Sequence, residues 1–221
     1  MQQDVPKQFL PVDGRPVLMH TLVAFHHPDI RIVVVLPEAE ATTWQQLCRQ
    51  YHFSVPHKVV AGGATRSASV YRGLLGIDDE EGLVAVHDGV RPLVSPELIS
   101  STYQQAERYG SAVAAVPLKD SIRQMRGEQN TACPRDEYRL MQTPQTFRLS
   151  GLRKAYDKAM KEGKEFSDDA SVWEYDGNLV HLATGEYRNL KVTTPEDLIV
   201  AEALLRQNAT GQNAARQAST Q

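Results

Sequence analysis

Three side chains that can bind a metal or an anion follow a single apolar run. Leu83–Val86 is typical of a fully buried strand, and His87, Asp88 and Arg91 come next, before Pro92 ends regular structure. Polar groups at the carboxyl end of a parallel strand lie where open α/β sheets bind ligands. A carboxylate can hold a divalent metal or a ribose hydroxyl, and a guanidinium can bind a phosphate through two hydrogen bonds. By itself, the segment fits a solvated surface turn equally well.

A second candidate segment is rich in glycine. Gly62 and Gly63 precede a predicted helix that begins at Arg66, and Ser69 lies in the next turn of that helix. The backbone N–H groups and the dipole at such a helix start favour an anion or the polar edge of a nucleotide. The glycine pair also fits an ordinary turn, so both interpretations stay open here.

Two lysines differ in what they indicate. Lys191 lies in an alternating polar and apolar stretch that predicts a strand, where a lysine needs a counter-charge such as a phosphate. Lys7 alone is better explained as a solvated lysine.

Other polar residues are interpreted as structural. We interpret His87 as a satisfied structural histidine and the Asp168-Asp169 pair as a helix cap. Residues 142–147 are given a mainly structural role, as the bend that starts the last part of the chain.

The rest of the chain predicts the elements that position these groups. Apolar runs alternate with amphipathic stretches, which predicts an α/β fold with a Rossmann-like, mostly parallel sheet and helices on both faces. Thr65 and Ser95 are candidate helix caps. The predicted strands are 30–36, 58–61, 83–87, 111–116, 179–183 and 188–192, and the predicted helices are 17–26, 38–51, 66–75, 96–109, 150–161, a short one within 166–175, and 195–206.

Two segments fall outside this alternation. Residues 117–139 are polar and have no helical period, so we expect an extended β-arm that leaves the main domain. Residues 207–221 lack large apolar side chains, which predicts a disordered tail after a domain of residues 1–206.

Composition narrows the class of protein. The chain has 221 residues, 41% of them hydrophobic, and a net charge of −3. This charge argues against a nucleic-acid partner, because a protein needs a basic face to bind nucleic acid. No apolar run reaches membrane-spanning length, so no membrane partner is expected. Cys48 and Cys133 are too few for a disulfide scaffold or a zinc site, and a cytoplasmic location is the natural expectation.

Taken in order, the segments resemble the 2-C-methyl-D-erythritol 4-phosphate cytidylyltransferase family. The ordered set is specific to this family and to its nearest relative, ribitol 5-phosphate cytidylyltransferase, and it spans residues 1–206 as one nucleotidyltransferase domain. Residues 116–121 are more similar to the methylerythritol enzymes. The shared patterns are Pro-Lys-Gln (6–8), Gly-Gly-x-x-Arg-x-x-Ser (62–69), His-Asp-x-x-Arg-Pro (87–92), Val-Pro-x-Lys-Asp-Ser (116–121), Thr-Pro-Gln-x-Phe (143–147) and Lys-Val-Thr-x-Pro-Glu-Asp (191–197).

The resemblance implies an enzyme of isoprenoid precursor biosynthesis that joins CTP and a polyol phosphate, with Mg²⁺, to give a CDP-alcohol and pyrophosphate. The substrate phosphate is already an anion, so positioning and charge neutralisation matter more than a general base. The implied roles are Lys7 and Lys191 beside the α-phosphate, Gly62, Gly63, Arg66 and Ser69 on the CTP side, Asp88 near the metal and the ribose, and Arg91, Ser121 and Arg135 on the substrate phosphate.

The family resemblance also implies a homodimer, because the family's arm crosses to a second subunit and would carry Ser121 and Arg135 into the partner's site. Ser121 stands where the family usually has Thr and keeps the hydroxyl. The family begins with a buried strand and a glycine-rich loop that wraps the CTP phosphates, whereas Met1 aligns with the end of that loop. We therefore expect this sequence to bind CTP poorly. Three hypotheses remain: the methylerythritol enzyme, the ribitol enzyme, and an inactive nucleotide-binding dimer.

Overall fold

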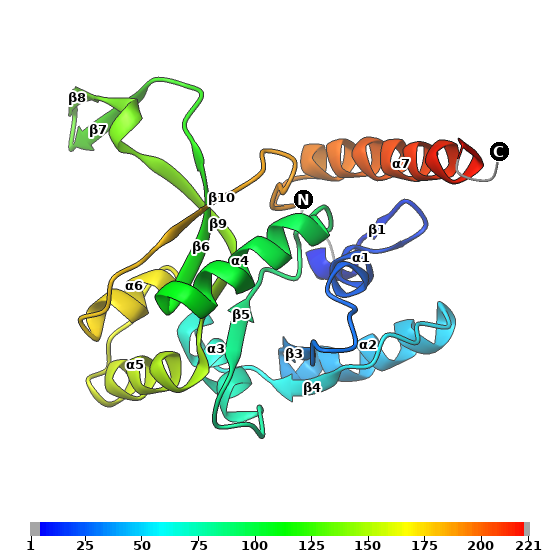
Figure 1. The fold of residues 1–221 in the computed structure, drawn as a ribbon, viewed down its shortest axis with the longest axis horizontal. Helices are drawn as coiled ribbons and strands as arrows, with labels where there is room; N and C mark the ends of the chain where they lie inside the picture. The colour runs from blue at the N-terminus through cyan, green and yellow to red at the C-terminus, as the bar shows by residue number, and fades with distance from the viewer. Residues whose placement is uncertain (1–4, 219–221) are drawn as a thin grey trace.

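The computed structural model describes the backbone of residues 5–218 and the side chains of residues 5–208. An α/β body carries a two-stranded hairpin that projects away from it, and the last helix lies across the same end of the body (Figure 1). The α/β class predicted from the sequence is therefore confirmed. No helix in the described part of the chain is long and apolar enough to cross a bilayer.

The main sheet has four strands. They lie in the order β10 (Leu182–Thr184), β6 (Ser111–Pro117), β9 (Arg139–Arg148) and β5 (Leu83–Val86). β10 runs parallel to β6, while β9 runs antiparallel to both β6 and β5. A separate parallel pair, β3 (Val33–Leu36) and β4 (Lys58–Ala61), lies beside it. The sheet is therefore mixed, and its reversed strand lies in the interior.

Helices pack on the main sheet and on the β3–β4 pair, and two of them begin at the predicted capping residues. The Thr65 side chain accepts a hydrogen bond from the Ala68 N–H, and that of Ser95 accepts one from the Leu98 N–H, so both predicted caps are confirmed. The helices are α1 (Val17–Ala24), α2 (Glu38–Gln50), α3 (Arg66–Leu75), α4 (Pro96–Tyr109), α5 (Leu149–Lys161), α6 (Asp169–Tyr175) and α7 (Pro195–Ala218), with short 3₁₀ helices η1 (Lys7–Phe9) and η2 (Arg135–Glu137).

The largest core cluster lies between the sheet and the helix pair α5–α6. Phe147 of β9 packs on the ring of Trp173, with ring centroids 5.3 Å apart. Leu152 and Tyr156 of α5 are fully buried in the same cluster. This packing fixes the buried end of β9 against α6.

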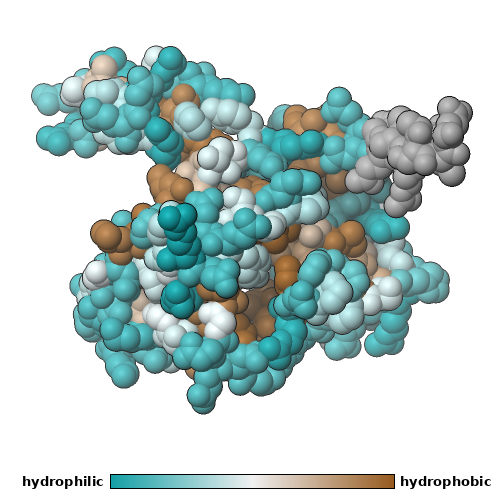
Figure 2. Space-filling model, in the orientation of Figure 1, coloured by the Kyte–Doolittle hydropathy of each residue, from teal (hydrophilic) through white to brown (hydrophobic). Residues whose placement is uncertain are grey.

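The predicted β-arm is present. β7 (Ile122–Arg126) and β8 (Gln129–Cys133) form an antiparallel hairpin that contacts the body only at its base (Figure 1). Most of its surface is hydrophilic, and hydrophobic residues gather near its base (Figure 2). The hairpin has no hydrophobic core of its own, because nearly all of its side chains are exposed.

Three predictions about individual elements are wrong. Residues 188–192 do not form a strand; the alternating pattern arises because Leu190 and Val192 pack into the core cluster that contains Val90, without pairing with a strand among the described residues. The segment predicted to be a bend, residues 142–147, instead lies within β9, and it is buried on both faces although most of its side chains are polar. The last helix does not end at Arg206 but continues to Ala218, since Ala, Gln and Arg in that stretch are good helix formers. Residues 219–221 of the predicted tail lie outside the described part.

The strand predicted to be fully buried is only partly buried. All four residues of β5 have intermediate exposure, because β5 pairs only with β9 among the described residues. β3 likewise pairs on one side only, with β4. A further hairpin was missed: β1 (Pro11–Val12) and β2 (Arg15–Pro16) are joined by Asp13-Gly14, both with positive φ, which is a known hairpin signal.

Candidate functional site

The centre of the candidate site is the Asp88 carboxylate, just beyond the carboxyl end of β5. Its Oδ2 atom accepts a hydrogen bond from Arg91 Nε at 3.1 Å and lies 3.3 Å from Lys191 Nζ. The Asp88 and Arg91 side chains are 16% and 9% exposed, whereas Lys191 is 41% exposed. The three charges thus form a mostly enclosed cluster from which only the lysine reaches solvent.

The two cations control the charge state of Asp88. Burial by itself would raise the pKa of this carboxyl group, but Lys191 and Arg91 outweigh it and hold the pKa below its ordinary value. Asp88 is therefore ionised at neutral pH, and the cluster carries one net positive charge. Such a cluster attracts an anion to the exposed lysine.

Backbone contacts hold the two halves of the cluster together. Arg91 Nη1 donates to the Asn189 carbonyl at 2.7 Å, and the Val192 N–H donates to the Val90 carbonyl at 2.9 Å. The Asn189 side-chain amide, in turn, donates to the Thr143 carbonyl of β9 at 2.8 Å. The loop that carries Lys191 is therefore fixed to the loop that carries Asp88 without any strand pairing.

Arg91 is more enclosed than a phosphate-binding arginine on an open surface. Its Nε and Nη1 atoms are already used by Asp88 and the Asn189 carbonyl. In this structure it supports the carboxylate and the lysine loop. The contact with a substrate phosphate that the family resemblance implies stays a prediction.

The Gly62-Gly63 segment is tightly bound to the start of α3. Ser69 Oγ donates to the Thr65 carbonyl at 2.9 Å and accepts from the Gly63 N–H at 3.0 Å. A Cβ atom on Gly63 would lie 2.5 Å from the Cβ of Ala68, so a larger residue would push the loop off the helix. The glycines are thus required for this close approach, and the Ser69 hydroxyl fixes the loop.

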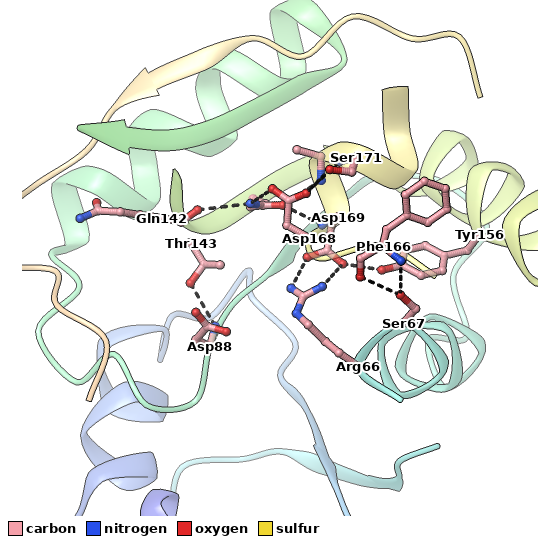
Figure 3. Close-up of polar contacts among 12 residues, drawn as sticks. Arg66, Ser67, Asp88, Gln142, Thr143, Tyr156, Phe166, Asp168, Asp169 and Ser171 are labelled. Carbon is pink, nitrogen blue, oxygen red and sulfur yellow. Dashed lines mark hydrogen bonds and ion pairs between the residues drawn. The ribbon is translucent and has the colours of Figure 1, made fainter. Parts of the chain in front are cut away.

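Arg66 points from the first turn of α3 toward Asp169 at the start of α6 (Figure 3). The Nη2–Oδ2 distance is 2.6 Å, and the Nη1–Oδ1 distance is 3.3 Å. Asp168, not Asp169, caps α6, through the Ser171 N–H at 3.0 Å. The cap prediction therefore holds for the first aspartate of the pair, and the second has a different partner that local sequence did not indicate.

His87 lies beside Asp88, and one of the two parts of its prediction holds. Its ring packs on Phe25, with centroids 4.8 Å apart, and both ring nitrogens are enclosed with no hydrogen-bond partner of ordinary geometry among the described residues. It is thus structural, as predicted, but not satisfied. Burial lowers its pKa to about 3, against a smaller opposing effect of Asp88, so it stays neutral at pH 7.

The remaining predicted residues lie apart from Asp88 within the chain. Lys7 is exposed on η1, and Ser121 and Arg135 are exposed on the arm. Arg135 Nη1 donates to the Lys119 carbonyl at 2.8 Å, which closes the arm near its base. No hydrogen bond or ion pair joins these three side chains to Asp88 or to its two cations in the described part of the chain.

Comparison with known proteins gives consistent matches over nearly the whole chain. The family model described as 2-C-methyl-D-erythritol 4-phosphate cytidylyltransferase matches residues 1–207. Proteins of that name from Bacteroides thetaiotaomicron and Porphyromonas gingivalis are 46% and 49% identical over 207 and 206 residues, covering 93% of this chain and 93% and 91% of theirs.

Solved structures give the same result. The Thermus thermophilus enzyme of that name superposes with a TM-score of 0.78 at 38% identity, covering 91% of this chain and 94% of its own. A 4-diphosphocytidyl-2C-methyl-D-erythritol synthase from Anaerococcus prevotii has a TM-score of 0.81 at 30% identity, covering 90% and 93%. The Rossmann-like fold predicted from the sequence agrees with these structures.

The neutral, buried His87 predicts a specific loss of stability in acid. Its folded pKa of about 3 lies below the ordinary value of 6.5, so below that value the unfolded chain binds a proton that the folded chain does not. The free energy of unfolding should fall with decreasing pH by up to about 1.4 kcal/mol per pH unit from this group. Urea unfolding between neutral pH and pH about 5 should show a shallower fall for His87→Phe, with His26→Phe, an exposed position, as control. If the free energy of unfolding fell equally with pH in the unmodified protein and in both variants, His87 would not be the group responsible.

Proposed function

The chain belongs to the 2-C-methyl-D-erythritol 4-phosphate cytidylyltransferase family, and we propose that it transfers the cytidylyl group of CTP to 2-C-methyl-D-erythritol 4-phosphate in isoprenoid precursor biosynthesis. The observation that carries this proposal is the match over 93% of the chain, which includes the Asp88–Lys191 cluster. Neither the ribitol enzyme nor an inactive dimer is favoured, since the matched family and relatives carry the methylerythritol name.

The reaction needs charge control at one phosphorus atom. A phosphate oxygen of the polyol phosphate forms a bond to the α-phosphorus of CTP, and the bond from that phosphorus to the bridging oxygen breaks, releasing pyrophosphate. Negative charge builds up on the α-phosphate oxygens as this happens. Lys191 suits this task because its Nζ is anchored on Asp88 yet 41% of its side chain is exposed. We assign Lys7, exposed on η1, to the same phosphate.

Mg²⁺ fits this site with Asp88 as its protein ligand. No cluster of three or more His, Cys, Asp or Glu side chains suitable for a metal occurs among the described residues. Mg²⁺ is commonly bound through one or two carboxylates together with substrate phosphates, so one aspartate is sufficient. Both cations contact Oδ2 of Asp88, which leaves Oδ1 for a metal. When bound there, the ion would neutralise charge on the triphosphate.

We assign the start of α3 to the nucleotide. Gly62 and Gly63 bring the backbone close to the helix start, and Ser69 fixes that backbone. Arg66 adds a guanidinium on the same turn of the helix. The N–H groups of Gly62 and Gly63 are bound to the Leu36 carbonyl and to Ser69 Oγ, so the donors that we assign to the polar edges of a nucleotide are the backbone N–H groups in the first turn of α3 and the Arg66 guanidinium.

We also propose a homodimer formed through the arm. Large apolar side chains are exposed on the arm and at its base: Met125 at 62%, Tyr138 at 44%, Leu140 at 53% and Met141 at 39%. A patch of this kind on a projecting hairpin suits burial against a second subunit. Ser121 and Arg135 would then bind the substrate phosphate in the partner's site, together with that subunit's Arg91.

The proposed substrate can be tested directly. Steady-state assays with CTP and either 2-C-methyl-D-erythritol 4-phosphate or ribitol 5-phosphate should give the larger kcat/KM for the methylerythritol compound. Formation of pyrophosphate is the measurement. A larger value for ribitol phosphate would reverse the assignment, and no turnover with either compound would contradict the enzymatic function.

The role of Lys191 predicts a loss of turnover. Lys191→Ala removes a positive charge beside the α-phosphate and should lower kcat by about 10²-fold or more. Lys161→Ala, at the exposed end of α5, is the matched control and should change kcat little. Near-normal turnover by a folded Lys191→Ala enzyme would exclude the catalytic role.

The shared site predicts complementation between two inactive variants. Arg135→Ala and Lys191→Ala homodimers should each be nearly inactive, because every site lacks one group. A heterodimer of the two has one site without both groups and one intact site. After random reassortment about half of the dimers are heterodimers, so about a quarter of all sites should work. Subunit exchange without any recovered activity would show that Arg135 does not serve a partner's site.

A further inference from the structure

A buried carboxylate fixes the direction of the Arg66 guanidinium. Asp169 is fully buried, with 0% of its side chain exposed, and its two oxygens face the two Nη atoms of Arg66 (Figure 3). Arg66 itself is 36% exposed. Both Nη atoms of the arginine are thus held by a carboxylate in the core, while its Nε–H and the second N–H of each Nη make no hydrogen bond among the described residues.

Asp169 is in turn held by two further elements, one through its carboxylate and one through its backbone N–H. Tyr156 of α5 donates its hydroxyl to Asp169 Oδ1 at 2.6 Å, and Gln145 of β9 accepts the Asp169 N–H at 3.0 Å through Oε1. Both supporting side chains are almost completely buried. Asp169 therefore cannot move without breaking contacts in the core, and this makes it a rigid support for the arginine.

The pairing also changes what Arg66 can offer to a ligand. Burial by itself would lower the arginine pKa, but Asp169 more than compensates, and the pKa is raised. Arg66 is therefore always charged, while its charge is balanced by the adjacent carboxylate. A balanced guanidinium serves better as an oriented hydrogen-bond donor to a neutral acceptor than as the counter-charge of a triphosphate.

We propose that Asp169 and Tyr156 are positioning residues that hold Arg66 as a donor to the nucleoside part of CTP. This inference rests on the proposed function, which places the nucleotide at the start of α3. The alternative is that the contacts only fasten α3 to α5 and α6. The Ser67 hydroxyl, which donates to the Phe166 carbonyl at 3.3 Å, already contributes to that fastening.

The chain contains a matched control for this alternative. Tyr71 of α3 donates its hydroxyl to Asp157 of α5 at 2.7 Å, and its ring stacks on Tyr156 with centroids 6.3 Å apart. Tyr71→Phe and Tyr156→Phe therefore remove the same group, a tyrosine hydroxyl bound to an aspartate, from the same region where α3 packs on α5. Only the Tyr156 hydroxyl is bound to the carboxylate that holds Arg66.

The test is calorimetric binding on the full chain, with CTP, CMP and pyrophosphate as separate probes. Tyr156→Phe should weaken the binding of CTP and of CMP by a similar factor, about three- to tenfold, and should leave the affinity for pyrophosphate unchanged. KM for CTP should rise by the same factor, with kcat and the KM of the polyol phosphate unchanged. Tyr71→Phe should leave all of these values at those of the unmodified protein.

Several outcomes would overturn the inference. Equal effects of the two tyrosine variants, or an unchanged CTP affinity in a folded Tyr156→Phe protein, would show that the contacts only join the helices. Weaker pyrophosphate binding would place Arg66 on the phosphates instead.

Asp169→Asn should weaken the binding of CTP and CMP more than Tyr156→Phe does. If Asp169→Asn fails to fold, Tyr156→Phe alone tests the inference. Binding of CTP without turnover would contradict the proposed function alone, and no CTP binding by the unmodified chain would overturn both.

Discussion

The candidate site depends on one largely enclosed carboxylate placed between two cations. Asp88 would be costly to bury alone, and Arg91 and Lys191 make its ionised form stable. The same pairing fixes the geometry, since Arg91 also binds the carbonyl of Asn189, two residues before the lysine. A loop without regular structure thereby presents Lys191 at a defined place. The exposed part of that lysine is where the cluster's positive charge reaches solvent.

Strand β9 connects this cluster to the Arg66 region. Its buried residues 142–146 are mostly polar, and two of them have partners outside the strand: the Thr143 hydroxyl accepts the Asp88 N–H, and Gln145 Oε1 accepts the Asp169 N–H. Buried polar groups without partners are costly, so these contacts both satisfy the strand and set the distance between the two halves of the site. The strand's antiparallel direction brings its polar residues past the carboxyl end of β5.

Elements were predicted well from the sequence where interactions between residues close in the chain decide them. Thr65 and Ser95 cap their helices through their own side chains, and both α3 and α4 begin and end where predicted. The arm was also predicted correctly, because a long polar stretch without helical period cannot pack on its own domain. In contrast, β9 was missed. Its Gln and Thr residues lack the alternating apolar pattern of a strand, and their burial is compensated only by partners distant in sequence.

The sequence by itself determined which groups are available: Asp88, Arg91, Lys191, the Gly62-Gly63 pair and Arg66, in an order specific enough to indicate a family. Only the tertiary structure decided how they are used. Lys191 lies on a loop rather than a strand, and Asp169 holds Arg66 rather than capping a helix. The physical reason is that caps and turns depend on neighbours a few residues apart. The Arg66–Asp169 pair joins residues 103 positions apart, and only the packing of α3, α5 and α6 brings them together.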